Sequence, residues 1–202
     1  MVYRRDIFTW ANLVTVVRLI CIPVFLWLLF TKDDRYLAAL LLGGLGATDW
    51  VDGFLARRLG QVSEIGKILD PAADRLLFLV AVIAMLIDKS VPLWFGVAAL
   101  AREVLVAVTA LVLGAMGARR INVTWLGKCA TFALMFAFPS FLASHADISS
   151  DRIFGAFAWM FGIPGLVLSY YTLSEYAPLA RHALADGRAR RASDSDTASQ
   201  IR

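Results

Sequence analysis

The stretch TDWVDGFLARRLGQVSEIGKILDPAADRL, residues 48–76, places four aspartates in a chain that is otherwise rich in apolar residues. The four are Asp49, Asp52, Asp70 and Asp74. An ionised carboxylate costs about 2.5–3.5 kcal/mol at the centre of a membrane helix, so four of them close together need compensation. A bound hard cation, which prefers oxygen ligands, supplies that compensation. The stretch therefore predicts a membrane protein with a divalent-metal site.

The rest of the chain consists mainly of long apolar segments. Of its 202 residues, 59% are hydrophobic and 18% are charged, whereas charged residues make up about 25% of a soluble domain. A membrane-spanning helix needs about 20 mostly apolar residues. We predict six such helices, at residues 10–30, 36–58, 66–87, 92–117, 124–144 and 152–174. The predicted fold class is an all-α membrane protein with about six transmembrane helices and an acidic cavity open to the cytoplasm.

The chain is predicted to form one membrane-embedded domain followed by a polar tail. The domain covers residues 1–176. The tail, residues 177–202, ends in GRARRASDSDTASQIR and is rich in Ser, Asp and Arg. Such a segment cannot bury enough apolar surface to fold, so we expect it to be disordered.

The charges between the apolar segments indicate the topology. Basic residues lie before the first predicted helix, between the second and third, around the start of the fifth and after the sixth. The positive-inside rule then places both termini in the cytoplasm of a multi-pass plasma-membrane protein, with the aspartates on the cytoplasmic side. The net charge of +4 reflects these loops and favours anionic membrane lipids. The basic residues form no patch interleaved with aromatic residues, so we predict no nucleic-acid partner.

Two helical faces are expected to carry the aspartates. Residues 49, 52, 53 and 56 have the spacing i, i+3, i+4, i+7, which is one face of a helix. Gly53 and Ala56 are small and allow a ligand or a neighbouring helix to come close. Gly66, Asp70 and Asp74 are spaced i, i+4, i+8. Pro71 interrupts this second pattern, so the helix either starts near Asp70 or kinks there.

The link between these two segments is short and polar, which predicts antiparallel neighbouring helices whose acidic faces meet. Four close carboxylates repel one another and must protonate or bind cations. Two Mg²⁺ or Mn²⁺ ions suit such oxygen ligands and could orient phosphates. Zinc is disfavoured because the two histidines, His145 and His182, lie outside the acidic stretch. Gly43, Gly44 and Gly46 are expected to serve close helix packing rather than nucleotide binding.

These residues resemble the signature of a known family, the CDP-alcohol phosphotransferases. The sequence D-x-x-D-G-x-x-A-R at residues 49–57 is followed, after eight residues, by G-x-x-x-D-x-x-x-D at residues 66–74. Every fixed position of the signature is present. The resemblance implies that two Mg²⁺ or Mn²⁺ ions are bound by Asp49, Asp52, Asp70 and Asp74. It also implies a CDP pocket formed by Asp49, Asp52, Gly53, Ala56, Arg57 and Gly66.

The same resemblance implies a reaction. An alcohol would attack the β-phosphate of CDP-diacylglycerol, Asp74 would act as the general base, and CMP would be released. Phosphoryl transfer depends on positioning and on neutralising charge, which a metal-bound acidic site can provide. The family resemblance also suggests a homodimer.

The identity of the acceptor depends on other residues. Asn12, Thr15 and Arg18 resemble the N-x-x-T-x-x-R opening of phosphatidylglycerophosphate synthases, and the pair Arg102-Glu103 resembles one shared with CMP-forming cardiolipin synthases. We expect glycerol 3-phosphate as the acceptor. Phosphatidylglycerol is the alternative, because Arg75 replaces the lysine usual in phosphatidylglycerophosphate synthases. The candidate acceptor-binding residues are Arg18, Arg102, Arg119, Arg120 and Lys128.

Other interpretations of these residues stay open. Arg18 can extend its guanidinium to the membrane surface, Arg102 can simply pair with Glu103, and Arg119 and Arg120 can serve only to set the topology. Acidic residues on neighbouring membrane helices are also typical of cation transporters. A transporter would carry its acids near the middle of the membrane along a through-path, whereas here they cluster at one end.

Overall fold

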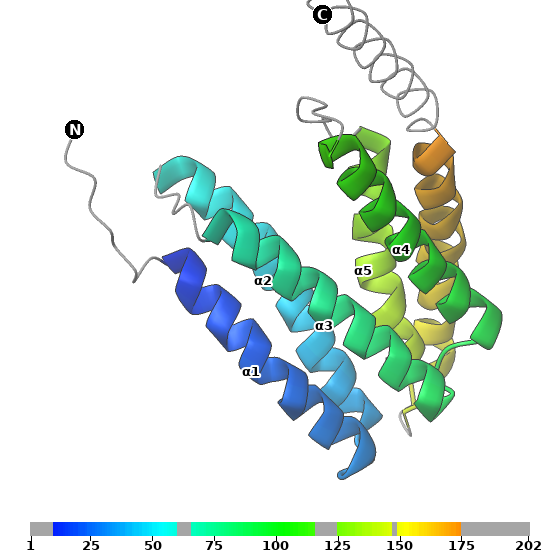
Figure 1. Ribbon diagram of the computed structural model, residues 1–202. Helices are drawn as coiled ribbons and strands as arrows, with labels where there is room; N and C mark the ends of the chain where they lie inside the picture. Colours follow the sequence, from blue (N-terminus) through cyan, green and yellow to red (C-terminus); the bar gives the residue numbers. More distant parts are fainter. Residues whose placement is uncertain (1–9, 60–65, 116–124, 147–148, 175–202) are drawn as a thin grey trace, which may run out of the picture. The chain divides into compact units, whose positions relative to one another are not determined.

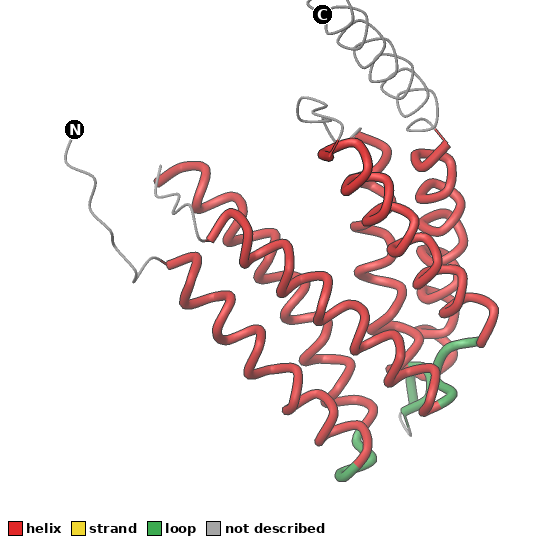
Figure 2. Tube along the Cα trace, in the orientation of Figure 1, coloured by secondary structure: helices red, strands yellow, loops and turns green. Residues whose placement is uncertain are grey.

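The computed structural model describes residues 10–59, 66–115, 125–146 and 149–174 (Figure 1). All regular structure in these ranges is α-helical, which confirms the predicted all-α class (Figure 2). The helices are α1 (Trp10–Phe30), α2 (Arg35–Leu59), α3 (Gly66–Asp88), α4 (Leu93–Ala115), α5 (Trp125–Ala143) and a further helix, Asp151–Ser174. Their ends differ from the predicted ends by no more than two residues. The predicted tail, residues 177–202, lies outside the described residues.

Two of these helices are long and apolar enough, within the described ranges, to cross a membrane. They are α5 and Asp151–Ser174. A shorter apolar helical segment covers Val16–Phe30. The described part of the chain thus has the composition of a membrane protein, while the predicted count of six spans remains a prediction.

The chain divides into two compact units. The first comprises Met1–Gly96 and Leu134–Gly162, and the second comprises Val97–Ala133 and Ile163–Arg202, as far as the structure describes these ranges. In the first unit, α1 packs against both α2 and α3 (Figure 1). The first unit carries the acidic stretch.

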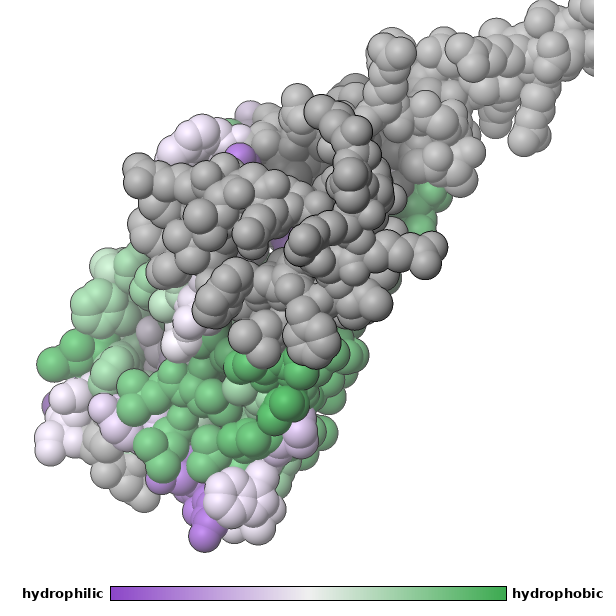
Figure 3. All heavy atoms as spheres, turned by 90° about the vertical axis from the view of Figure 1, so that its left-hand side faces the viewer, coloured by the Kyte–Doolittle hydropathy of each residue, from purple (hydrophilic) through white to green (hydrophobic). Residues whose placement is uncertain are grey.

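The inner face of α1 is a stripe of large side chains that meets small residues on α3. Phe25 and Leu29 of α1 are almost fully buried, as are Ala73, Ala81 and Ala84 of α3. Alanines let two helices approach closely, as is common in membrane helix pairs. The opposite face of α1 exposes large apolar side chains, and Figure 3 shows this side of the unit as a hydrophobic area. An exposed apolar surface of this kind suits contact with lipid.

An aromatic cluster centres on Phe95 at the beginning of α4. Its ring is fully buried and lies 5.1 Å from the ring of Phe141, 5.8 Å from that of Phe138 and 6.0 Å from that of Trp159. Gly162 lies against the same ring, since a Cβ atom there would come within 3.0 Å of Phe95 Cζ. The cluster joins α4, α5 and the last helix within the first unit.

The glycines of α2 lie against α5. A Cβ atom at Gly43 would lie 3.6 Å from Pro139, and one at Gly46 would lie 2.6 Å from Met135 Cε. These contacts support the predicted role in helix packing for Gly43 and Gly46. Gly44 faces open space, with nothing within 4 Å.

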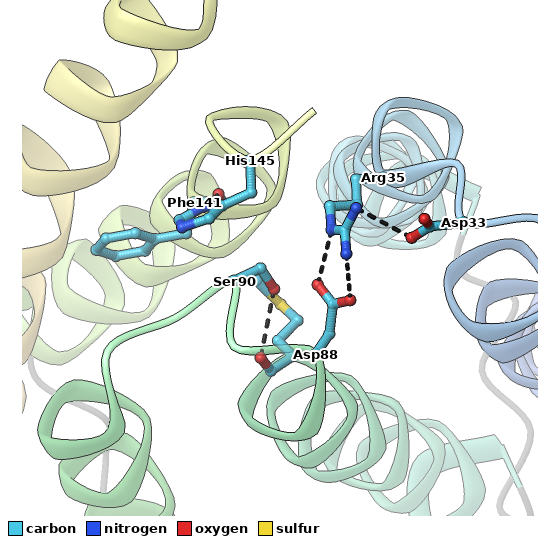
Figure 4. A network of polar contacts seen from close by, with 7 residues as sticks. Asp33, Arg35, Asp88, Ser90, Phe141 and His145 are labelled. Atoms are coloured by element: carbon cyan, nitrogen blue, oxygen red, sulfur yellow. Dashed lines mark hydrogen bonds and ion pairs between the residues drawn. The ribbon is translucent and has the colours of Figure 1, made fainter. Parts of the chain in front are cut away.

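Ion pairs of Arg35 join the α1–α2 turn to the end of α3 (Figure 4). Its guanidinium donates two hydrogen bonds to Asp88, from Nε to Oδ2 at 3.1 Å and from Nη2 to Oδ1 at 3.0 Å. Its Nη1 lies 3.0 Å from Asp33 Oδ1. A two-point contact of this kind fixes both distance and orientation, so it holds the start of α2 against the end of α3. We call these three residues the Arg35 clamp.

The helix ends next to the clamp are capped by local hydrogen bonds. Asp33 and Lys89 adopt left-handed backbone conformations, with φ of 53° and 62°. After Lys89, the Ser90 N–H donates to Met85 O at 3.1 Å, which closes α3 in a Schellman-type arrangement. Asp34 accepts a hydrogen bond from the Leu37 N–H at 2.9 Å and so caps the start of α2.

In the second unit, Tyr170 links the last helix to α4. Its hydroxyl donates a hydrogen bond to the carbonyl oxygen of Ala98 at 2.8 Å. Ser169 and Thr172, on the same helix as Tyr170, are buried. The Thr172 hydroxyl donates to Ser169 O at 2.9 Å.

Candidate active site

The first half of the candidate site lies on α2. This helix is continuous to Leu59, so positions 49, 52, 53 and 56 share one helical face, and position 57 follows them on the same helix. Thr48, just before the first aspartate, donates its hydroxyl to Leu45 O at 2.8 Å. The side chains of residues 49–59 lie outside the described part of the structure.

The second half lies on α3, which begins at Gly66. The possibility that this helix starts near Asp70 is therefore wrong, since helical backbone precedes Asp70 and continues through Pro71. Pro71 is the sixth residue of this helix, so it lacks the N–H that would bond to the carbonyl of Lys67, and the helical backbone continues past it all the same. Positions 66, 70 and 74 share one face. The side chains of Gly66 and Asp70 lie outside the described residues, whereas that of Asp74 is described.

An ion pair between α1 and α3 involves the last aspartate of the signature. Arg18 Nη1 contacts Asp74 Oδ1. The Arg18 side chain is only 6% exposed, and that of Asp74 is 45% exposed. The neighbours Val17 and Leu19 lie on the exposed side of α1, so Arg18 points inward from a helix whose adjacent residues face outward.

This geometry rules out one reading of Arg18. A guanidinium that extends to the membrane surface would be exposed, and this one is buried against α3. The sequence singled out Arg18 but not its partner. No local pattern could have revealed the pairing, because the two residues are 56 positions apart (74 − 18) and lie on different helices.

The other candidate acceptor residues lie elsewhere. Arg102, on α4, donates from Nη1 to Glu103 Oε2 at 2.9 Å, which is the pairing considered as an alternative to an acceptor-binding role. Both side chains are mostly buried. Lys128 is exposed on α5, and Arg102 and Lys128 belong to the second unit. Arg119 and Arg120 lie outside the described residues.

The acidic residues fit a hard divalent cation by their chemistry. Each of the two helices carries two carboxylates about one turn apart, and all four donors are oxygen atoms. Among the side chains that the structure describes, no group of three or more His, Cys, Asp or Glu residues gathers. This observation concerns Asp74 alone of the four, so it does not test the predicted site. His145 lies near the Arg35 clamp, with Nδ1 at 3.0 Å from Phe141 O.

Comparison with known proteins places the chain among enzymes. The sequence profile of the CDP-alcohol phosphatidyltransferase family matches residues 8–164. A cardiolipin synthase (CMP-forming) of Streptomyces coelicolor is 36% identical over 171 residues, which are 82% of this chain and 79% of that protein. A putative cardiolipin synthase of Mycobacterium tuberculosis is 34% identical over 174 residues, 86% of this chain and 83% of its relative.

A second group of relatives carries the other expected activity. The CDP-diacylglycerol–glycerol-3-phosphate 3-phosphatidyltransferase of Pseudomonas fluorescens is 33% identical over 189 residues, 88% of this chain and 93% of that protein. These names confirm that the enzyme class is a CDP-diacylglycerol-dependent phosphatidyltransferase of phospholipid biosynthesis, and they give no support to a cation transporter. The profile covers both halves of the acidic signature, and the chain belongs to the CDP-alcohol phosphatidyltransferase family.

Proposed function

We propose that this enzyme transfers the phosphatidyl group of CDP-diacylglycerol to the free glycerol hydroxyl of phosphatidylglycerol, forming cardiolipin and CMP. The observation that carries the choice of acceptor is the similarity to relatives named cardiolipin synthase, at 36% and 34% identity. The sequence alone favoured glycerol 3-phosphate as the acceptor, so this proposal reverses the order of the two candidates.

The two acceptors differ in charge. The phosphomonoester of glycerol 3-phosphate carries between one and two negative charges at neutral pH, and its recognition favours several cations. The phosphodiester of phosphatidylglycerol carries one negative charge, which a single guanidinium can match.

Asp74 is the proposed general base. Its side chain is partly exposed, so an acceptor hydroxyl can reach it within hydrogen-bond distance. The carboxylate takes the proton of the hydroxyl, whose oxygen bonds to the β-phosphorus of CDP-diacylglycerol. The bond between that phosphorus and the bridging oxygen breaks, and CMP leaves with the electron pair.

The proposed metal and CDP sites use the signature residues. Mg²⁺ or Mn²⁺, as two ions, would be held by Asp49, Asp52, Asp70 and Asp74, and would neutralise phosphate charge when bound. The CDP group would lie along Asp49, Asp52, Gly53, Ala56, Arg57 and Gly66. The small residues on this α2 face leave room for a nucleotide next to the backbone.

The proposed setting is the plasma membrane. Six helices would span it, both termini would be cytoplasmic, and the acidic cavity would open to the cytoplasm. The apolar outer face of α1 and the two helices long enough to span a membrane support this arrangement. A homodimer is proposed from the family resemblance.

Glycerol 3-phosphate is the second candidate acceptor. The Pseudomonas fluorescens relative is named for this activity and is only slightly less similar to the chain. The residues Asn12, Thr15 and Arg18 also match the opening found in phosphatidylglycerophosphate synthases. Both reactions use the same donor and release the same nucleotide, so CMP release alone does not separate them.

The test is a direct assay of the lipid product. The protein would be purified in detergent and supplied with CDP-diacylglycerol and Mn²⁺ or Mg²⁺, together with either phosphatidylglycerol or glycerol 3-phosphate. Mass spectrometry would follow CMP and the lipid. Cardiolipin formed only with phosphatidylglycerol is the expected result, and phosphatidylglycerophosphate formed in its place would establish the second candidate. Metal-independent turnover would contradict the proposed metal site.

A further inference from the structure

Arg18 is a buried cation, and its partner Asp74 has two other roles in the proposed mechanism. Arg18 Nη1 contacts Asp74 Oδ1, and the arginine side chain is almost completely buried between α1 and α3. The same carboxylate is the proposed base and a proposed metal ligand. A guanidinium and a divalent ion on one carboxylate repel each other, and the repulsion is strong where water is scarce.

The pair also explains how an acidic site can fold within a membrane protein before it holds a metal. A carboxylate surrounded by other acids is unfavourable unless a positive charge lies close by. Arg18 provides such a charge from the neighbouring helix. The stripe of α1 that contains Arg18 continues through Phe25 and Leu29, which are also buried, so packing holds this face of α1 against α3, while the long Arg18 side chain keeps its rotatable bonds.

We propose that Arg18 is a resident counter-ion of Asp74 that exchanges with the metal. In the metal-free protein the guanidinium neutralises Asp74. When a divalent cation binds at the aspartates, it takes over this carboxylate, and the guanidinium turns to the anionic phosphate of the acceptor. Metal binding therefore prepares the acceptor site.

The coupling of metal binding to the acceptor rests on the proposed function, whereas the exchange between Arg18 and the metal at Asp74 does not. Exchange at Asp74 requires only the metal and the protein. The coupling to the acceptor is reciprocal. If bound metal raises the affinity for the acceptor by a given factor, bound acceptor raises the affinity for the metal by the same factor. Removal of the guanidinium should abolish this mutual effect.

The experiment compares Arg18→Met with the unmodified protein in detergent, without any lipid substrate. Methionine keeps an unbranched apolar stem and removes the charge. Electron paramagnetic resonance would measure free Mn²⁺ during a titration. We expect Arg18→Met to bind Mn²⁺ at least about fivefold more tightly, the lower end of typical coupling between sites. Unchanged or weaker binding would overturn the exchange.

Two further variants make the result specific. Arg75→Gln removes the same charge from the residue next to Asp74, on an exposed position of α3, and we expect the Mn²⁺ affinity to change by less than about twofold because exposed charges are well screened. An equal gain in both variants would mean a general charge effect and would overturn the specific role of Arg18. Arg18→Lys keeps the charge and should behave like the unmodified protein. Should Arg18→Met fail to fold, Arg18→Gln takes its place in the same titration.

The acceptor part has its own readout. Binding of short-chain phosphatidylglycerol would be measured with and without Mn²⁺. We expect Mn²⁺ to strengthen binding in the unmodified protein and to have no effect in Arg18→Met. Equal strengthening in both proteins would overturn the coupling. If the protein turned out to use another acceptor, the Mn²⁺ titration alone would still decide the exchange.

Discussion

At the scale of single residues, Asp74 is the point at which several predicted roles meet. It completes the aspartate signature, lies on α3 and contacts Arg18 of α1. Its partial exposure distinguishes it from Asp88 at the other end of the same helix, whose side chain is only 7% exposed. Asp88 is held in a structural ion pair, whereas Asp74 can still meet a ligand.

Replacement of Asp74 by Asn should abolish turnover and retain much of the binding of CDP-diacylglycerol. Asparagine has the same shape but cannot accept the proton, and general base catalysis contributes about 10²–10⁴-fold to the rate. CMP release and binding of the donor to the purified variant would be measured together. Asp151→Asn, an exposed acid at the start of the last helix, is the matched control and should keep full activity. Near-normal turnover in Asp74→Asn would remove Asp74 as the base.

Two glycines provide a second prediction at this scale. Gly162→Ala should lower the thermal stability, because its Cβ atom would lie 3.0 Å from a ring that is enclosed by other aromatic side chains. Gly44→Ala should preserve or raise stability, since nothing lies within 4 Å and alanine is better than glycine in a helix by about 0.8–1.0 kcal/mol. Melting of both variants in detergent, followed by size-exclusion chromatography, would compare them. A stabilising Gly162→Ala would show that the Phe95 cluster can rearrange.

The sequence could identify the candidate aspartates but not the contacts that they make. A fixed spacing on one helix is local information, and the signature at residues 49–74 has it. The contact of Arg18 with Asp74 depends on how far α1 is shifted along α3, which no local spacing contains. Arg102 and Glu103 are adjacent in sequence, and their pairing could be predicted for that reason.

At the scale of helices, the Arg35 clamp is the main polar contact described between the ends of α2 and α3. Arg35 and Asp88 are end residues of α2 and α3, and Asp33 lies in the turn before α2. The bidentate contact between Arg35 and Asp88 lies at the opposite end of α3 from its signature residues. The clamp therefore ties the start of α2 to the end of α3, at the ends of the two helices that are far from the aspartates.

Removal of one clamp residue should destabilise the protein more than removal of both. Asp88→Asn removes the partner that holds Arg35 by two hydrogen bonds and leaves the exposed Asp33 beside the guanidinium. Because Arg35 is 28% exposed, we expect a loss on the order of 2 kcal/mol, less than the cost of breaking a fully buried pair. The double variant Arg35→Met and Asp88→Leu replaces the pair by apolar side chains and should recover part of this loss. Thermal melting of the purified proteins would measure the loss of stability in the single and the double variant. Equal losses in the single and the double variant would show that the charges themselves contribute little.

Helix boundaries were well predicted because local signals determine them. Asp34 caps α2, and the turn at Lys89 separates α3 from α4. The packing faces could not be predicted in the same way. In a soluble protein the polar side of a helix indicates solvent, but a helix that faces lipid is apolar on both sides, so periodicity does not reveal which side is buried. Arg18 is an example, since its neighbours on the exposed side are valine and leucine.

At the scale of the whole molecule, the described residues form two units, and the acidic signature belongs to the first. The signature also lies at the C-terminal end of α2 and the N-terminal end of α3, while the clamp lies at their other ends. If the helices span the membrane, the aspartates and the clamp face opposite sides. The predicted topology then assigns the aspartates to the cytoplasmic side, where the head groups of the lipid substrates are accessible and CMP can be released.

Reporter fusions would test this assignment. Alkaline phosphatase is active only outside the bacterial cytoplasm, and green fluorescent protein exported through the general secretion route does not fluoresce. We expect a phosphatase fusion after Lys89 to be active and a fusion after Ser174 to be inactive, with the opposite pattern for the fluorescent protein. The physical reason is the bias of Arg and Lys toward the cytoplasmic loops. Replacement of Arg57 and Arg58 by Gln should weaken that bias and raise phosphatase activity at a fusion placed after Leu59. An active phosphatase after Ser174 in the unmodified chain would reverse the topology and place the aspartates on the outer side, where a CDP-linked donor made in the cytoplasm could not reach them without crossing the membrane.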